Sequence, residues 1–180
     1  TFASTISTPR FSGTHFAPNI TESPTAMESR RGVGSAEGAP SITTAAVTRK
    51  IHHAIAISAP RSEVYAALAN IDHMRQWHEG TMTGEAVPGK TVTWTPKPGL
   101  RFGWRIDELN PDTSIVRTAV EGPGNTVGKT LKIQLSDLPD GRTEVTLADG
   151  DWAGDDPHLA YCNTYWGGVL QDLKSYVEKS

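Results

Sequence analysis

The chain has 180 residues, a net charge of −3 and one cysteine, Cys162. This length allows one domain with a full hydrophobic core, and a single cysteine excludes an internal disulfide and a zinc site built from several cysteines. The charge and the lack of an apolar run of about 18 residues argue against nucleic-acid binding and membrane insertion, and the cysteine usage favours a cytoplasmic protein.

Residues 1–48 differ in composition from the rest of the chain. They are rich in Ser, Thr, Pro and Gly, and their apolar residues follow no regular period, which is typical of a disordered tail. Met27 is a candidate start residue, in which case the residues before it (1–26) are leader or vector sequence. We therefore expect one folded domain at residues 49–180.

The folded pattern begins with a strand and two short helices. Isoleucines that share one face of residues 51–58 predict a half-buried strand. Apolar residues at helical spacing predict a helix over residues 59–71, where Pro60 suits the first turn. A second helix is predicted over residues 72–80, and Gly80 closes it.

A run of strands follows the two helices. Apolar and polar residues alternate in short segments that are separated by turn residues. Leu131, Ile133 and Leu135, for example, share one face, while polar residues take the other, so one face of the predicted sheet is covered. The predicted strands span residues 81–87, 90–95, 100–109, 113–121, 129–138 and 142–150.

A long helix is predicted to end the chain. Asp156 suits its N-cap and Pro157 its first helical position. The pair Gly167–Gly168 lies inside this helix and costs it about 2 kcal/mol relative to alanine, so we expect the glycines to allow a strand to approach closely or to leave volume open beside the helix. The apolar stripe of the helix consists of Leu159, Cys162, Trp166, Leu170, Leu173 and Val177.

This order of elements predicts an α+β fold, in which a curved antiparallel sheet of about six or seven strands wraps around the C-terminal helix. The order resembles the START-like, or SRPBCC, superfamily with its helix-grip fold, which includes polyketide cyclases and Hsp90 ATPase-activator homologues. The resemblance rests on the segments IAISAPRSEVYAALANIDHMRQW, FGWRIDELNPDTSIVRTAVEG and WGGVLQDLKSYVEK. It indicates the fold more strongly than the activity, because this fold serves many functions.

The resemblance implies a mainly apolar, aromatic-lined pocket between the C-terminal helix and the sheet. The five tryptophans fall on elements that the superfamily arranges around its cavity. The alternative role for each of these aromatic side chains is core packing alone. The predicted ligand-binding residues are His73, Trp77, His78, Trp94, Phe102, Trp104, Glu121, Trp152, Tyr161, Cys162, Tyr165 and Trp166.

No motif for nucleotide or metal binding is complete. Gly128-Lys129-Thr130 resembles the end of a phosphate loop, but Pro123 stands where that loop needs its first glycine. The acids of DGDWAGDD lack the later ligands of a calcium loop, and the histidines form no metal triad. We therefore predict no metal or organic cofactor, and we expect Cys162 to be a small buried hydrophobe.

Some polar side chains are candidates to project into the cavity, where an enzyme would use them to polarise a carbonyl and move protons. The pattern assigns none of them as a catalytic base. They are His73, His78, Arg105, Glu121, Asp151, Tyr161, Asn163 and Tyr165.

Three functions remain open. The first is binding of a hydrophobic, aromatic or polyketide-like small molecule, for transport, biosynthesis, or sequestration as in the enediyne self-resistance proteins, which also resemble this fold. The second is a polyketide cyclase, aromatase or dehydratase that acts by holding its substrate in one shape. The third is a protein-interaction module like the chaperone-activator homologues, for which an exposed apolar patch is expected.

Overall fold

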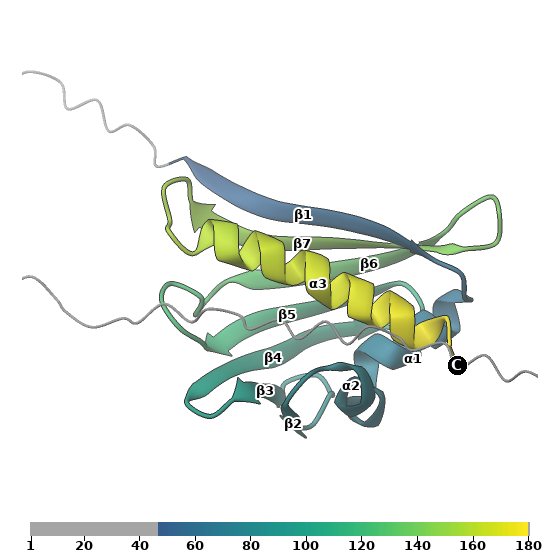
Figure 1. Cartoon of the computed structure of the whole chain (residues 1–180), viewed down its shortest axis with the longest axis horizontal. Coiled ribbons are helices and arrows are strands. Elements are labelled where there is room, and N and C mark those ends of the chain that lie inside the picture. The colour runs from purple at the N-terminus through teal and green to yellow at the C-terminus, as the bar shows by residue number, and fades with distance from the viewer. Residues whose placement is uncertain (1–46, 180) are drawn as a thin grey trace, which may run out of the picture. The chain divides into compact units, whose positions relative to one another are not determined.

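The computed structural model describes residues 47–179, which form a seven-stranded sheet and three helices (Figure 1). Residues 1–46 of the predicted tail lie outside the described residues, so the tail stays a prediction. The elements are β1 (Thr48–Ile57), α1 (Arg61–Ala69), α2 (Ile71–Trp77), β2 (Thr81–Gly84), β3 (Thr91–Lys97), β4 (Leu100–Asn110), β5 (Ser114–Glu121), β6 (Thr130–Asp137), β7 (Thr143–Ala153) and α3 (Leu159–Val177).

The sheet is antiparallel throughout, with the strand order β1-β7-β6-β5-β4-β3-β2. Figure 1 shows α3 lying across one face of the sheet, with α1 and α2 beside the C-terminal part of this helix. The first and last strands of the chain are neighbours, because β1 pairs with β7. The predicted α+β helix-grip fold is confirmed.

The alternating residues of the strands supply the core. Leu131, Ile133 and Leu135 of β6 are buried, whereas the residues between them are exposed. On α3, Leu170, Leu173 and Val177 are buried against the sheet, as the apolar stripe predicts.

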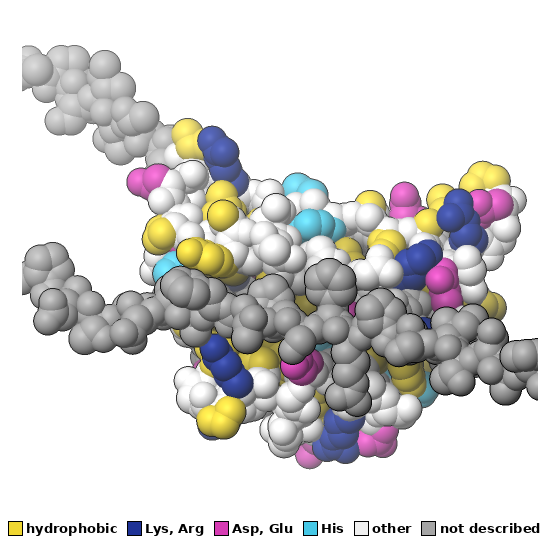
Figure 2. Space-filling model, in the orientation of Figure 1, with side chains coloured by type: hydrophobic (Ala, Val, Ile, Leu, Met, Phe, Trp, Pro, Cys, Tyr) yellow, Lys and Arg dark blue, Asp and Glu magenta, His cyan; other side chains and the backbone are white. Residues whose placement is uncertain are grey.

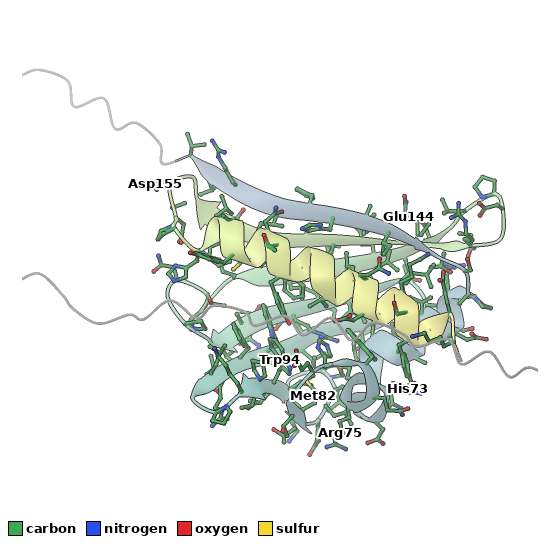
Figure 3. The ribbon with its side chains drawn as sticks, viewed as in Figure 1. His73, Arg75, Met82, Trp94, Glu144 and Asp155 are labelled. Carbon is green, nitrogen blue, oxygen red and sulfur yellow. The ribbon has the colours of Figure 1, made fainter. Side chains whose placement is uncertain are left out.

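The buried side chains form two hydrophobic clusters. The larger one contains residues of β1, β5, β6, β7, α1 and α3. The smaller one consists of Met74, Met82, Val92, Trp94 and Ile106, where α2 meets β2, β3 and β4, and Figure 3 shows Met82 and Trp94 at that end of the molecule. Trp77 and Tyr165 pack against both clusters. Leu109 also packs against both clusters, so one aliphatic and two aromatic side chains lie at the boundary between them.

The C-terminal helix begins at Leu159, two positions after the predicted first residue Pro157. The reason is that Asp156 closes the turn before the helix. Its carboxylate accepts hydrogen bonds from the backbone N–H of His158 (2.9 Å) and from the side-chain amide of Asn125 (3.0 Å). These bonds tie the turn to the loop between β5 and β6, and the helix starts only after His158.

The glycine pair of α3 does not bring a strand close to the helix. Both glycines are exposed. A Cβ added to Gly168 would meet no atom within 4 Å, and one added to Gly167 would meet only His53 Cε1, at 3.7 Å. Of the two expectations, open volume beside the helix is therefore the one that the structure supports, and it lies on the solvent side.

Replacing Gly168 by alanine should raise the free energy of unfolding by about 1 kcal/mol, because alanine favours the helix and its methyl group meets nothing. Urea denaturation measures the change. Gly84→Ala is the matched control: its φ is +98° and the new Cβ would clash with the carbonyl oxygen of Thr91, so that variant should lose stability. A loss of stability in Gly168→Ala would show that the glycine has a packing role.

Candidate functional site

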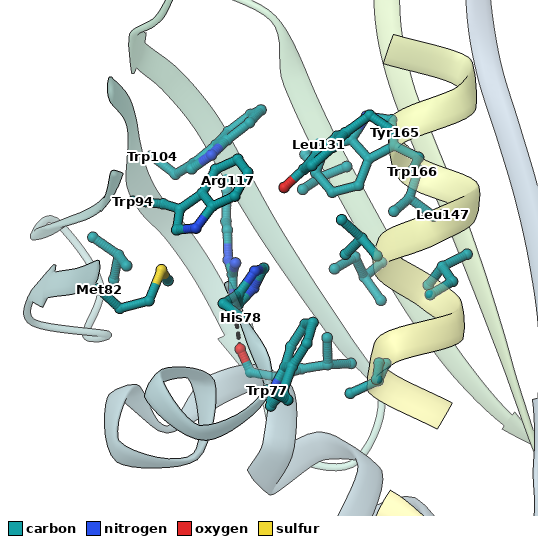
Figure 4. Close-up of a pocket in the computed structure, with 16 residues that line it drawn as sticks. Trp77, His78, Met82, Trp94, Trp104, Arg117, Leu131, Leu147, Tyr165 and Trp166 are labelled. Atoms are coloured by element: carbon teal, nitrogen blue, oxygen red, sulfur yellow. Dashed lines mark hydrogen bonds between the residues drawn. The ribbon is translucent and has the colours of Figure 1, made fainter. Parts of the chain in front are cut away.

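The candidate site is an internal cavity between α3 and the concave face of the sheet (Figure 4). Side chains from all three helices and from strands β2 to β7 line it. Most are aliphatic or aromatic. Among the residues that the sequence predicts for the site, those on the cavity wall are Trp77, His78, Trp94, Trp104, Tyr165 and Trp166.

The cavity is small, with a volume of about 30 Å³. One water molecule needs roughly 10–15 Å³, so this space holds a few waters at most. Pockets for drug-sized ligands have volumes of roughly 300–1,000 Å³. A ligand of that size would therefore have to displace lining side chains or shift α3 from the sheet.

Aromatic rings contact one another between β3, β4 and α3, some stacked and some tilted. The ring centroids of Trp94 and Tyr165 are 5.3 Å apart, and those of Trp94 and Phe102 are 5.2 Å apart. On the other side of Tyr165 lies Trp166, at 5.2 Å, and Trp166 is 5.9 Å from Trp104. These separations are typical of favourable aromatic pairs. The rings thus form a continuous row across the cavity.

Most of the indole N–H groups are held by acceptors. Trp77 donates to the carbonyl oxygen of Ala67 (3.0 Å), and Trp94 donates to that of Glu79. Trp104 has no hydrogen-bond partner within the described part of the chain. Its ring is consequently held by packing alone.

Among the described residues, Arg117 of β5 is the one Arg or Lys side chain on the cavity wall. It is only 7% exposed. Its Nη2 donates to the carbonyl oxygen of Leu68, and the sulfur of Met74 lies 3.9 Å from the same nitrogen. Its Nε is buried and has no partner among residues 47–179. Burial lowers the pKa of Arg117 to about 10, so the guanidinium remains charged at neutral pH.

His78 lies next to this charge. It caps the C-terminal end of α2, and its ring stacks on that of Trp77 with centroids 3.9 Å apart. Burial, and then the positive charge of Arg117, lower the pKa of His78 to about 3. The imidazole is therefore neutral at physiological pH.

A second buried polar group lies under the N-terminal half of α3. Asp149 of β7 is 2% exposed, and its Oδ2 accepts hydrogen bonds from the indoles of Trp166 (2.9 Å) and Trp152 (3.3 Å). Its Oδ1 has no partner among the described residues. Burial raises the pKa of this carboxyl group, although the two indoles act in the opposite direction.

Neither Arg117 nor Asp149 was among the predicted site residues. For both residues, the feature of the sequence that indicates burial is their position in the alternation of the strand. Arg117 alternates with the buried Ile115 and Ala119, and Asp149 alternates with the buried Leu147. A charged residue on the apolar face of a strand indicates a buried charge.

The structure places the other predicted site residues away from the cavity wall. His73 faces α3, where its Nδ1 lies 2.9 Å from the hydroxyl of Tyr176, and Figure 3 shows it on α2 at the end of the molecule. Glu121 is exposed and pairs with Arg101 at 3.5 Å. Phe102 does not line the cavity, but its ring stacks on Trp94 and, with centroids 6.5 Å apart, on Tyr165.

Of the remaining predicted residues, Trp152 is buried in β7 beside Asp149 and does not line the cavity, and the others lie near the start of α3 or on the surface. Tyr161 is 65% exposed. Cys162 packs against the larger cluster. Burial, and then the negative charges of Asp149 and Asp156, raise the pKa of its thiol to about 11. The thiol is therefore a poor nucleophile at neutral pH. The other polar candidates, Arg105, Asp151 and Asn163, are exposed. Arg105 forms an ion pair with Asp107, and Asp151 forms one with Lys50.

Within residues 47–179, no three His, Cys, Asp or Glu side chains come together as a metal site would require. None of the helices in this part of the chain has the length and apolar composition to cross a membrane.

Comparison with known proteins gives a family and a fold. Residues 58–178 match the family described as Activator of Hsp90 ATPase homolog 1-like protein. A search of curated proteins gave no significant match.

Solved structures of several proteins share the fold. The Aha1 dimer from Colwellia psychrerythraea has 24% sequence identity and a TM-score of 0.65, over 72% of this chain and 96% of that one. CalU16 from Micromonospora echinospora has 17% sequence identity and a TM-score of 0.60, over 72% of this chain and 74% of the CalU16 chain. DynU16, described as a putative protein in the dynemicin biosynthetic locus, has 19% sequence identity and a TM-score of 0.60, over 72% of this chain and 47% of the DynU16 chain. At these identities the likeness establishes the fold alone.

Proposed function

The chain belongs to the Activator of Hsp90 ATPase homolog 1-like family, within the START-like or SRPBCC superfamily, and from this membership we propose that it binds a hydrophobic, aromatic or polyketide-like small molecule between α3 and the sheet. The observation that carries the proposal is the row of aromatic rings on the cavity wall, in which the ring of Tyr165 contacts those of both Trp94 and Trp166. A planar ligand would replace these ring contacts with contacts of the same kind.

Opening the cavity is part of this proposal, since a volume of about 30 Å³ does not accommodate such a ligand. Two features support opening. Trp104 is not fixed by a hydrogen bond within the described residues, and Gly167 and Gly168 weaken α3 directly after the two lining residues Tyr165 and Trp166. The role that fits is transport, sequestration or a biosynthetic accessory function in the cytoplasm, where Cys162 would remain a free thiol.

Titration with planar polyketides and with fatty acids should reveal the ligand class. We expect saturable quenching of tryptophan fluorescence by the planar compounds, together with a stability gain of about 2.7 kcal/mol at a ligand concentration of 100 Kd. Trp104→Ala should weaken this binding about threefold to tenfold, because one aromatic contact is lost. Tyr161→Ala, at an exposed position, is the control and should leave binding unchanged. Absence of saturable binding to either class would refute the proposal.

A cyclase, aromatase or dehydratase is the second candidate, and the neutral His78 beside Arg117 favours it. The guanidinium would stabilise the enolate form of a substrate, and the neutral imidazole could donate a hydrogen bond to a substrate carbonyl, whereas its pKa of about 3 makes it a weak base. The test is product formation from a linear polyketide by the wild type and by His78→Gln. If the wild type binds tightly but forms no product, the enzymatic role is refuted and the binding role remains.

The family description favours a third candidate, an activator of a chaperone ATPase. The large exposed hydrophobic residues of the described part are Val47, Val87, Val120, Val127 and Tyr161. On the face drawn in Figure 2, outside the part that grey atoms cover, charged side chains are interspersed with apolar ones. Stimulation of Hsp90 ATPase activity by the purified chain tests this role directly.

A further inference from the structure

We propose that Arg117 binds a carboxylate group of the ligand, so that the preferred ligand is a planar aromatic acid with its rings between Trp94 and Tyr165 and its carboxylate at the guanidinium. This inference rests on the proposed binding function and adds the chemical class of the ligand. It starts from a buried charge that the described part of the protein leaves without an ionic partner.

The guanidinium has spare donors that are directed to the inside of the protein. It carries five N–H groups, and only Nη2 has acceptors within the described residues, namely the carbonyl oxygen of Leu68 and the sulfur of Met74. Nε is buried and unpartnered there. Figure 4 shows the side chain of Arg117 entering the cavity region, with the dashed bond to the carbonyl below it. A carboxylate is the group that matches free guanidinium donors best, because it accepts two parallel hydrogen bonds.

No acidic side chain of the described residues neutralises this charge. The cavity wall contains no Asp or Glu, and Arg117 forms no ion pair within residues 47–179. Arg101, Arg105 and Arg142 lie near the surface instead, and each has a carboxylate within 3.5 Å. Two acidic side chains are also buried within residues 47–179, and neither pairs with Arg117: Asp149 accepts from two indoles, and Asp156 from Asn125 and His158. Buried charges in proteins are normally paired, so an unpaired one at a cavity indicates a ligand group.

The surroundings also favour an anion over a cation or a neutral polar group. His78 is neutral and contributes no competing positive charge, while the hydroxyl of Tyr165 stays protonated because burial raises its pKa. The other lining side chains of the site are apolar or aromatic. A carboxylate would therefore find its strongest electrostatic partner at Arg117, in a medium that screens the attraction little.

The bond from Arg117 to Leu68 also has a structural role. Leu68 lies in the last turn of α1, where carbonyl oxygens lack helical partners, and a cation there stabilises the helix end. Loss of stability in an Arg117 variant would therefore not test ligand recognition. The test has to compare ligands that differ only in charge.

The experiment measures the affinities of anthracene-2-carboxylate and anthracene-2-carboxamide for the full chain by tryptophan quenching and calorimetry at neutral pH. We expect the carboxylate to bind about tenfold more tightly than the amide, because only the carboxylate neutralises the guanidinium. This preference should persist in about 0.5 M NaCl, since a buried pair is screened little. Equal affinities in the wild type would overturn the role of Arg117 while leaving small-molecule binding intact. Failure of both compounds to bind would overturn this inference and count against the binding function itself.

Two variants assign the preference to Arg117. Arg117→Gln should reduce the ratio of affinities to about one while the amide still binds, and Arg117→Lys should keep part of the preference because the charge remains. Near-ultraviolet circular dichroism shows whether each variant is folded. If Arg117→Gln is unfolded, the ratio of carboxylate to amide affinity in the wild type and in Arg117→Lys still tests the proposal. A folded Arg117→Gln that keeps the full preference for the carboxylate would overturn the assignment.

Discussion

Acidification from pH 7 to pH 4 should lower the free energy of unfolding by about 3 kcal/mol through His78 alone. The pKa of this side chain is about 3 in the folded protein and has its ordinary value of 6.5 in the unfolded chain. Between these two values the unfolded chain binds a proton that the folded protein does not bind. Stability from His78 is therefore present above pH 6.5 and is lost as the pH falls towards 3.

Urea denaturation at intervals between pH 7 and pH 4 measures this loss. His78→Gln should flatten the pH dependence in that window, because the titrating group is removed. His52→Gln is the control, since His52 is exposed on β1 and should leave the wild-type slope unchanged. The difference between the wild type and His78→Gln is the quantity to compare, because Asp156 and Glu178, whose pKa values are lowered, also lose stability at the acid end of this range, and Asp149, whose pKa is raised, acts in the opposite direction. The same slope in the wild type and in His78→Gln would show that the buried imidazole is not the source.

Trp166→Ala should lower the free energy of unfolding by about 3–5 kcal/mol. Trp166 is 7% exposed and packs in the larger cluster, so truncation leaves a cavity under α3. It also removes one of the two donors to the buried carboxylate of Asp149, whose Oδ1 already lacks a partner within the described residues. The variant thus loses packing and leaves a buried acid with Trp152 alone.

A second substitution separates the two effects. Trp166→Phe keeps most of the ring but not the N–H group, and we expect it to lose about 1–3 kcal/mol. Tyr161→Ala, one turn earlier on the exposed side of α3, should change stability by less than about 0.5 kcal/mol. Denaturant titration of all three variants gives the comparison. A loss in Trp166→Ala no larger than in Trp166→Phe would mean that the ring itself contributes little.

The fold was predictable because it follows from short periods in the sequence. The alternation of Leu131, Ile133 and Leu135 predicts a strand with one buried face, and the stripe through Leu170 and Leu173 predicts a helix that packs on it. Apolar patterns of this kind predict the fold because burial of the apolar face is the main source of stability.

The chemistry of the candidate site was less predictable, because it depends on contacts between distant segments. The acceptor for Arg117 belongs to a residue 49 positions earlier, and the donor that holds Asp149 from α3 lies 17 positions later. The start of α3 was placed too early for a similar reason, since Asn125 holds Asp156 from another loop. A linear pattern shows that a charged residue falls on an apolar face, but it does not show which group will satisfy that residue.

The position of the cavity decides which contacts a guest molecule would have to exchange. It lies at the boundary between the two hydrophobic clusters, and Trp77 and Tyr165 belong to the margin of both. Widening this boundary would separate aromatic faces, whereas Val145 and Val177 of the larger cluster do not line the cavity and would keep their aliphatic contacts. The protein could therefore exchange contacts among its own aromatic rings for contacts with the rings of a ligand, while each hydrophobic cluster stays packed.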